Sequence, residues 1–252
     1  MEKNKMEKNK MTFDKVKNKY VINGEITVQN ALHIGSGIEK DNRDAPFISL
    51  DDNKEFYIPG SSFRGYLSTK LERFLDSDND FKLKEKKSGE TLNEADVMLI
   101  FGYTNLDKLK TKISEDNQKE KEEKLVEKNI KIQKRIAEKL DITEITDELN
   151  ADKIKEKIKD IRSMAGRIHV SDMPVIKDVE AITRDGIKID RNTGATKKGA
   201  KFDYDVVPAG TKFELHIELE NIEDYQLDLL GLALRDIMNE EGDLFGGKIS
   251  RG

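Results

Sequence analysis

The sequence has no cysteine and no tryptophan among its 252 residues, and it has only three histidines. Without cysteine the chain can form neither disulfides nor thiolate metal sites. His33, His169 and His216 are far apart in the sequence, which argues against a zinc site. No apolar run approaches the roughly 18–20 residues that cross a bilayer. We therefore expect no membrane partner and a cytoplasmic location.

An excess of positive charge is also missing, because the net charge is −5. This balance argues at first against a nucleic-acid partner. Ten acids and three bases lie in residues 214–252, however, which gives that segment a charge of −7 and leaves about +2 for the rest. Phosphate binding requires local positive potential and not a basic protein. The composition therefore weakens the case for nucleic-acid binding without removing it.

The chain is long enough for one large domain, with 36% hydrophobic residues for a core. The start, MEKNKMEKNKM, repeats a polar unit and lacks the apolar segment of a signal peptide, so residues 1–18 are expected to form a disordered tail. Strand and helix patterns alternate over residues 19–252. The main predicted elements are a strand at 20–34, a helix at 62–75, a strand at 211–219 and a helix at 224–239. This order predicts an α+β domain, with an antiparallel sheet and a ferredoxin-like core.

Two segments are predicted to expand this core. In residues 104–163, Ile132 and Ile136 recur at helical spacing within a Lys- and Glu-rich stretch. A helical insertion with a solvated face is favoured there over a dedicated binding arm. In residues 176–207, apolar and charged residues alternate around a turn at 192–194, which predicts a β-hairpin. Such a sparsely apolar hairpin cannot bury both faces, so it is expected to project.

A phosphate receptor is predicted where the helix at 62–75 begins. Ser61 or Ser62 can cap this helix, so that its N-terminal amides face outward beside Arg64. Amides, a hydroxyl and a guanidinium together suit the phosphate of a nucleic-acid backbone.

Two glycine-rich loops provide further candidates. His33 precedes Gly35 and Ser36, and its role is either a hydrogen bond to a loop carbonyl or a contact with a phosphate or base. The C-terminal loop combines glycines, which let a backbone approach a phosphodiester, with the cations Lys248 and Arg251.

Asp44 lies in the loop IEKDNRDAPF, two residues before Pro46. It is either an ordinary capping residue of the turn or a catalytic carboxylate. Because RNA supplies its own nucleophile, the 2′-hydroxyl, one carboxylate suffices to orient that group or to hold a hydrated divalent ion. Asp41 in the same loop is a second candidate for this role.

Several motifs in order resemble one family. They are HIGSG (33–37), an acid before a proline, IPGSSFRGYLSTKLE (58–72), TRDGIKIDRNTGATKKGAKFDYDVVPAGTKF (183–213) and LFGGKISRG (244–252). This series resembles the RAMP superfamily of CRISPR-associated proteins, in particular the repeated backbone subunit of type III effector complexes. The resemblance covers most of the chain except the N-terminal tail and the helical insertion.

The resemblance implies a modified RNA-recognition fold and subunits stacked along a guide RNA. It implies as partners the guide RNA, the target RNA and other effector subunits, including copies of this chain. A β-hairpin thumb at 176–207 would intercalate in the guide–target duplex, and Asp44 would support target cleavage with a divalent metal, expected to be Mg²⁺. The resemblance names no metal ligands. By the resemblance, His33, Ser61, Ser62 and Arg64 would line the guide path. Together with the candidates from the residues themselves, the predicted RNA-binding residues are His33, Gly35, Ser36, Ser61, Ser62, Arg64, Lys70, Arg184, Lys188, Lys248 and Arg251.

Two alternatives stay open. The first is a purely structural RNA-binding subunit of the same complex without nuclease activity, and the second is an enzyme that trims precursor guide RNA. The chain also stops at Gly252, where members of the family continue into a closing strand. We therefore expect either a longer natural chain or a neighbouring polypeptide that completes the sheet.

Overall fold

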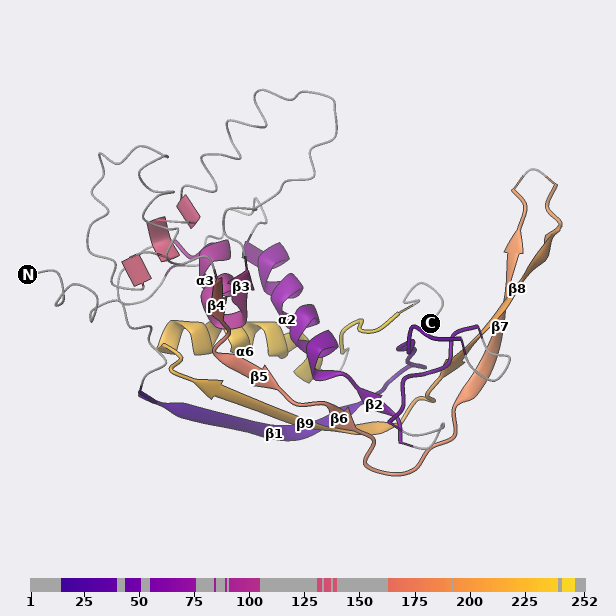
Figure 1. Cartoon of the computed structure of the whole chain (residues 1–252), viewed down its shortest axis with the longest axis horizontal. Helices are drawn as coiled ribbons and strands as arrows, with labels where there is room; N and C mark the ends of the chain where they lie inside the picture. Colours follow the sequence, from indigo (N-terminus) through magenta and orange to yellow (C-terminus); the bar gives the residue numbers. More distant parts are fainter. Residues whose placement is uncertain are drawn as a thin grey trace, which may run out of the picture. The chain divides into compact units, whose positions relative to one another are not determined.

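The computed structural model describes residues 15–39, 44–50, 55–75, 84, 89, 91–104, 131–132, 134–136, 138–139, 163–191, 193–239 and 242–247. Its named helices are α2 (Gly60–Leu75), α3 (Glu94–Phe101) and α6 (Asp224–Met238), and the described residues between 131 and 139 are helical as well. The strands are β1 (Lys19–Thr27), β2 (Tyr57–Ile58), β3 (Gly102–Thr104), β4 (Ser163–Ala165), β5 (Ile168–Val170), β6 (Met173–Pro174), β7 (Ile182–Ile189), β8 (Thr196–Val206) and β9 (Lys212–Glu220) (Figure 1).

The strands form one three-stranded sheet, of order β1-β9-β5, and three two-stranded pairs, β2-β6, β3-β4 and β7-β8. The three pairs are antiparallel. The predicted α+β class is therefore confirmed, while the ferredoxin-like core stays a prediction. In the described part of the chain, no helix is long and apolar enough to cross a membrane.

One predicted element differs in detail, and one helix was not predicted. The strand expected at 20–34 ends at Thr27. The chain beyond it is held by isolated backbone bonds, in which Val28 donates to Thr211, and Leu32 and Val207 donate to each other. The apolar stretch 95–101 forms helix α3. It begins at a capping box, in which the Asn93 side chain accepts from the Ala95 amide and the Asp96 side chain accepts from the Asn93 amide.

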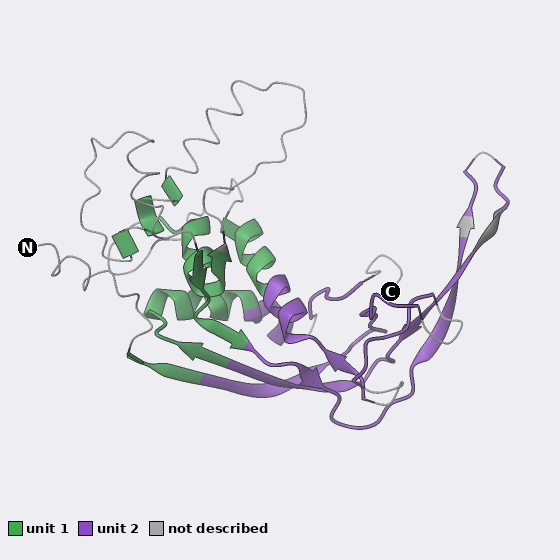
Figure 2. Ribbon diagram, in the orientation of Figure 1, with its two compact units in different colours: residues 1–20, 67–169, 218–233 green, residues 21–66, 170–217, 234–252 purple. Residues whose placement is uncertain are grey.

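The chain divides into two compact units (Figure 2). Unit 1 comprises residues 1–20, 67–169 and 218–233, and unit 2 comprises residues 21–66, 170–217 and 234–252. The predicted division into a tail, one domain and two excursions stays a prediction. Most of the expected tail and insertion lies outside the described residues.

Unit 1 has an apolar cluster of Ala95, Leu99, Ile132, Ile136 and Met164. Ile132 and Ile136 are 2% and 1% exposed, so the helical stripe predicted within the insertion packs into the core of this unit. The described residues of the insertion are therefore not a fully solvated excursion.

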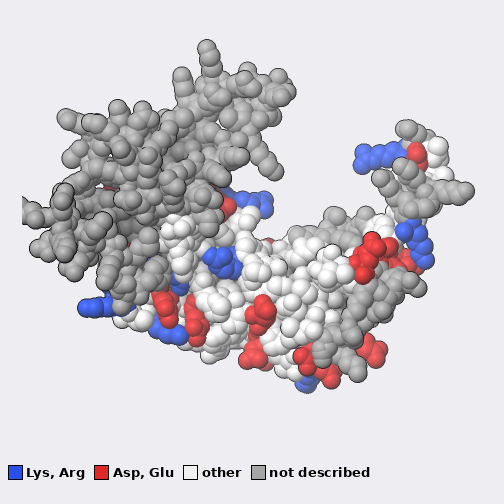
Figure 3. All heavy atoms as spheres, in the orientation of Figure 1, with Lys and Arg blue, Asp and Glu red and all other residues white. Residues whose placement is uncertain are grey.

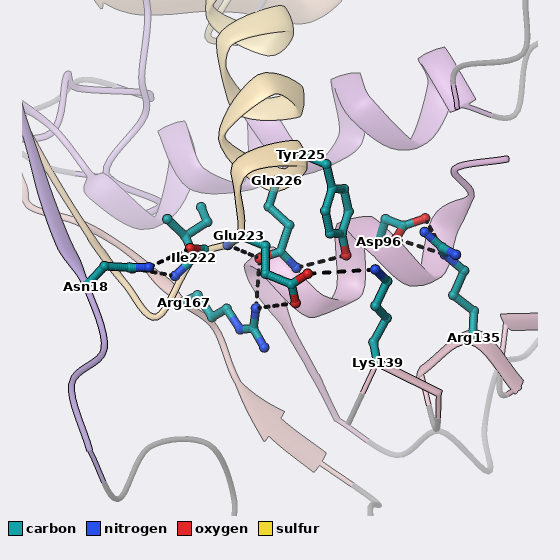
Figure 4. Close-up of polar contacts among 9 residues, drawn as sticks. All are labelled: Asn18, Asp96, Arg135, Lys139, Arg167, Ile222, Glu223, Tyr225 and Gln226. Carbon is teal, nitrogen blue, oxygen red and sulfur yellow. Dashed lines mark hydrogen bonds and ion pairs between the residues drawn. The ribbon is translucent and has the colours of Figure 1, made fainter. Parts of the chain in front are cut away.

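A buried polar network accompanies this cluster (Figure 4). The guanidinium of Arg135 donates to both carboxylate oxygens of Asp96, at 3.0 and 3.1 Å, and both side chains are almost fully buried. Burial raises the pKa of the Asp96 carboxyl, although the Asn93 amide and Arg135 act in the opposite direction. Close by, Lys139 pairs with Glu223 at 3.7 Å. The insertion is thus held by charge pairs as well as by apolar packing.

A second part of the network joins Arg167, the residue before β5, to the start of α6. Arg167 donates from Nη1 to Gln226 at 2.8 Å and lies 3.6 Å from Glu223 (Figure 4). Burial, followed by the charges of Asp96 and Glu223, raises the pKa of the Tyr225 hydroxyl. The hydroxyl therefore stays protonated, and the Lys139 ammonium lies 4.5 Å from the centre of its ring.

Unit 2 contains the predicted hairpin, formed by β7 and β8 with its turn near Gly194. It extends beyond the rest of its own unit (Figure 2). Ile182, Ile187 and Ile189 on β7 are 50%, 53% and 57% exposed, as expected for a strand that cannot bury both faces. Gly186 faces Phe202, and a Cβ there would come within 2.3 Å of the phenyl ring. Glycine therefore allows Phe202 to lie across the hairpin.

The start of α2 requires another glycine. A Cβ on Gly60 would lie 2.1 Å from the carbonyl oxygen of Val170, whereas one on Gly65, in the same helix, would meet nothing within 4 Å. The Gly60 amide donates to the carboxylate of Asp172 at 2.8 Å. The sequence-based expectation that Ser61 or Ser62 caps α2 is wrong, because both lie inside its first turn.

We predict that Gly60→Ala lowers the free energy of unfolding by about 3 kcal/mol, since backbone atoms must move to admit the methyl group. The matched variant Gly65→Ala should raise it by about 0.5–1 kcal/mol, because alanine restricts the unfolded chain and meets open space. Urea unfolding of both variants measures the two values. Equal effects of the two substitutions would contradict the packing at Gly60.

We also predict that Arg135→Met costs about 3–5 kcal/mol, because it leaves the Asp96 carboxylate buried without its cation. Loss of the guanidinium raises the pKa of Asp96 further above its unfolded value. The variant is then relatively more stable at acidic pH and loses stability as pH rises through that pKa. Adding Asp96→Asn should recover most of the loss at pH 7. If the loss in the free energy of unfolding is the same at every pH and is not reduced by Asp96→Asn, the cause is lost packing and not the unpaired charge.

Candidate nucleic-acid interface

Asp44 lies at the foot of the β7-β8 hairpin, held there by a reciprocal pair of hydrogen bonds. Its amide donates to Oδ1 of Asp203 at 2.8 Å, and the Asp203 amide donates to Oδ2 of Asp44 at 2.9 Å. Beside this pair, Ala45 forms a parallel bridge with Tyr204. Asp44 is exposed. Its carboxylate is thus accessible to a ligand, while its backbone is fixed to β8.

Asp205 connects the same foot to His33. Its amide donates to Ala45 at 3.0 Å, and its carboxylate accepts the Thr183 hydroxyl at 2.8 Å. Its carbonyl oxygen lies 2.7 Å from Nδ1 of His33, which is buried. Because a carbonyl can only accept, Nδ1 carries the proton of this bond. The bond to a carbonyl predicted as one role of His33 is therefore present, and it comes from a strand.

The C-terminal glycine-rich loop packs on this histidine. The Gly247 amide donates to the His33 carbonyl at 2.8 Å. A Cβ on Gly246, whose φ is +100°, would lie 2.6 Å from a methyl carbon of Leu32. Glycine is therefore needed for the loop to lie against the strand end, and its backbone forms part of the site.

The loops and the first turn of α2 surround a shallow hollow within unit 2. Two residues predicted from the sequence, Gly35 and Ser62, are brought together in it. The hollow is lined by Ile34, Gly35, Ser62, Tyr66, Leu244, Phe245, Gly246 and Gly247. Ser61 and Ser62 are exposed and Arg64 is half-buried. Because Asp172 occupies the Gly60 amide, the first turn offers a weaker phosphate receptor than the sequence suggested.

The other predicted RNA-binding residues lie away from this hollow or outside the described part of the chain. Ser36 uses its hydroxyl in a local turn, donating to the carbonyl of Ile38 at 3.1 Å. Lys70 lies on the part of α2 that belongs to unit 1, and Arg184 is half-buried on β7. The side chain of Lys188 and the residues Asp41, Lys248 and Arg251 lie outside the described part of the chain. Their RNA-binding and catalytic roles stay predictions.

A divalent ion could use Asp44 and Asp203. Each carboxylate accepts one backbone bond from the other residue, which leaves an oxygen on each for a cation. Two carboxylates with water and phosphate oxygens match the coordination that Mg²⁺ prefers. Among the described residues, however, no group of three or more acidic or histidine side chains is arranged to hold a metal. Asp44 and Asp203 would therefore supply only part of the coordination of a metal ion, and water or phosphate oxygens of RNA would supply the rest.

Sequence reasoning missed Asp203, Tyr66, Tyr204 and Phe245. Acidic and aromatic residues alternate on β8 at Asp203, Tyr204 and Asp205. This pattern was the available sequence signal for Asp203 and Tyr204. Asp44, the partner of Asp203, is 159 residues away, so no local pattern indicates the pairing.

On the face shown in Figure 3, the described Lys and Arg side chains lie singly or in small groups among acids. This distribution agrees with the net charge of −5. On this face, phosphate contacts are therefore expected at particular positions and not over a continuous basic surface.

Residues 25–252 match the RAMP superfamily. The match covers most of the chain, so this protein belongs to the RAMP superfamily. Membership supports a CRISPR-associated, RNA-binding role. Among curated proteins, a sequence search finds no significant match.

We predict that Arg64→Ala weakens binding of single-stranded RNA and lowers the slope of log affinity against log salt by about 0.7, the value for one phosphate contact. Arg73→Ala is the matched control, because helical periodicity places Arg73 on the opposite side of α2. Fluorescence anisotropy titrations at several salt concentrations measure the slope. An unchanged slope in Arg64→Ala would exclude Arg64 as a phosphate ligand.

Proposed function

We propose that this RAMP protein is a guide-RNA-binding backbone subunit of a type III CRISPR effector complex, and that it cleaves target RNA at regular intervals. The observation that carries the proposal is the position of Asp44. The Asp44 carboxylate is exposed and fixed to the foot of a projecting hairpin. If the hairpin inserts between two neighbouring bases, these bases would lie at a constant distance from Asp44. Repeated subunits would then place cuts at even spacing.

The chemistry needs only one acid because RNA supplies the nucleophile. The 2′-oxygen attacks the adjacent phosphorus while the proton of the 2′-hydroxyl passes to a base. The bond to the 5′-oxygen breaks, and the leaving 5′-oxygen takes a proton from water. The products carry a 2′,3′-cyclic phosphate and a 5′-hydroxyl. Asp44 would accept or orient the 2′-hydroxyl, and Asp203 would hold the backbone of Asp44 in place. A divalent ion bound between the carboxylates would supply charge stabilisation for the phosphate.

Base pairing would read the sequence in this scheme. The protein would hold the RNA by its backbone, through the glycine-rich loops and the first turn of α2. The acidic balance of the chain is compatible with this mode, because the hold is divided among many stacked subunits.

A structural subunit without nuclease activity is the second candidate. It is favoured by the lack of a third metal ligand near Asp44 and Asp203 among the described residues. A guide-RNA processing enzyme ranks lower, because His33 is buried and its Nδ1 is bound to Asp205. Incubating the purified chain with precursor guide RNA tests that third possibility.

We predict that Asp44→Ala preserves assembly and RNA binding but slows target cleavage at least about 100-fold, as expected for loss of a general base or metal ligand. Asp178→Ala, in an exposed loop, is the matched control. The assay follows end-labelled target RNA in the assembled complex, with Mg²⁺ and with a chelator. Evenly spaced cuts that persist in Asp44→Ala would overturn the catalytic assignment. A wild-type complex that binds target but never cuts would favour the structural subunit.

A further inference from the structure

Unit 2 contains a cavity of about 290 Å³ beside the hollow described above. It is bounded by the chain that follows β1, by the first part of α2 and by the C-terminal loop, and it shares Tyr66, Leu244, Phe245 and Gly247 with that hollow. Its volume is at the lower limit of small-molecule pockets, and apolar protein cavities of roughly 150 Å³ already bind benzene. The cavity therefore has room for one ring with a short side chain.

The buried part of the lining is apolar on most sides. Ile58, Phe63 and Val206 are almost fully buried, and Val28 and Leu32 are buried as well. Such a surface favours an apolar group, because a charged or polar group would lose its hydration there without gaining hydrogen bonds. The inner part of the cavity therefore suits the apolar body of a ligand.

Three aromatic rings form one wall of the cavity. Phe63 and Tyr66 stack on α2, with ring centres 5.9 Å apart and planes 29° apart. Phe245, from the C-terminal loop, stands edge-on to both, with centre distances of 5.7 and 5.3 Å. Because aromatic side chains favour stacked or edge-on contacts with other rings, the apolar body of the ligand is expected to be a ring.

The exposed rim of the cavity carries an acid, Asp243. Its carboxylate accepts the Tyr66 hydroxyl and, at 2.7 Å, the Leu244 amide. Both donors are uncharged, so these bonds orient the carboxylate without neutralising it. Because a carboxylate can accept about four hydrogen bonds, an ammonium group can join the donors already present.

Other groups at the rim favour a cation over an anion. Gly242, the residue before Asp243, lies against Gln29, whose amide oxygen would be 2.9 Å from a Cβ at that glycine. A second oxygen acceptor therefore lies near the acid. The described residues that line the cavity include no lysine or arginine. An ammonium group at the rim would also lie near the rings of Tyr66 and Phe245, whose negative faces attract cations.

We propose that the cavity binds a small organic amine, with a ring buried against Phe63 and Val206 and an ammonium group beside Asp243. An apolar inner wall and an acidic rim in one cavity match such a molecule, because it has an apolar body and one positively charged end. This site is separate from the phosphate contacts proposed above, and it depends neither on RNA binding nor on cleavage.

The test uses three molecules of similar shape and different charge, namely 2-phenylethylamine, 2-phenylethanol and 3-phenylpropionate. Calorimetric titration of the full-length chain at pH 7 measures the three dissociation constants. The amine should bind about fivefold to tenfold more tightly than the alcohol, as expected for one exposed ion pair and one cation–π contact. The carboxylate should bind most weakly, because Asp243 repels it.

The decisive variant is Asp243→Asn, because asparagine can still accept the Tyr66 hydroxyl but carries no charge. In this variant the amine should lose its advantage over the alcohol. Glu214→Gln, at an exposed acid of unit 2 outside the cavity, is the matched control and should behave as wild type.

A second pair of measurements locates the ring of the bound amine. Val28→Phe partly fills the cavity and should weaken the binding of both the amine and the alcohol. If this variant fails to fold, nuclear Overhauser contacts in the wild-type chain supply the same information. The phenyl protons of the bound amine should contact methyl groups of Ile58 and Val206, which line the buried part of the cavity.

Three results would overturn the inference. The first is a wild-type chain to which none of the three molecules binds saturably. The second is an alcohol that binds as tightly as the amine, which would show that the cavity selects for apolar shape and not for charge. The third is binding of the amine that is unchanged in Asp243→Asn, or that gives no contacts with Ile58 and Val206, because the amine would then lie elsewhere on the surface.

Discussion

The set of hydrogen bonds at the foot of the hairpin, which joins residues 44–45 to residues 203–205 of β8, is the interaction on which the site depends. Asp203 fixes Asp44, and Asp205 fixes both Ala45 and His33. A loop acid, a buried histidine and a projecting ribbon are thereby held in one geometry. Without this pairing, Asp44 would be an ordinary acid in an exposed loop. With these bonds, the Asp44 carboxylate keeps a fixed position relative to the hairpin.

Glycine has a specific part in this arrangement. At Gly246 and Gly247 it lets the C-terminal loop lie directly against the strand end at His33, and at Gly186 it admits the ring of Phe202. These contacts bring backbone amides and aromatic faces close together. An acidic protein can bind RNA by such means, because close backbone approach and stacking replace much of the long-range attraction that a basic surface supplies.

Elements with strong local patterns could be predicted from the sequence. The alternation of Phe213, Ile217 and Leu219 predicted β9, and the spacing of Ile132 and Ile136 predicted a helix that is indeed packed. The site could be predicted only in part. Asp172, which caps α2 from 112 residues away, displaced the serine cap that local reasoning favoured. The partnership of Asp44 with Asp203 spans 159 residues and has no local signal. Long-range pairing, and not propensity, decided these points.

The most direct test of the central claim is a structure of the assembled particle with guide and target RNA. Our account predicts the hairpin between two bases and a target phosphate within hydrogen-bonding or metal-bridging distance of the Asp44 carboxylate. RNA that follows another surface, with Asp44 facing only solvent and the hairpin away from the duplex, would contradict it.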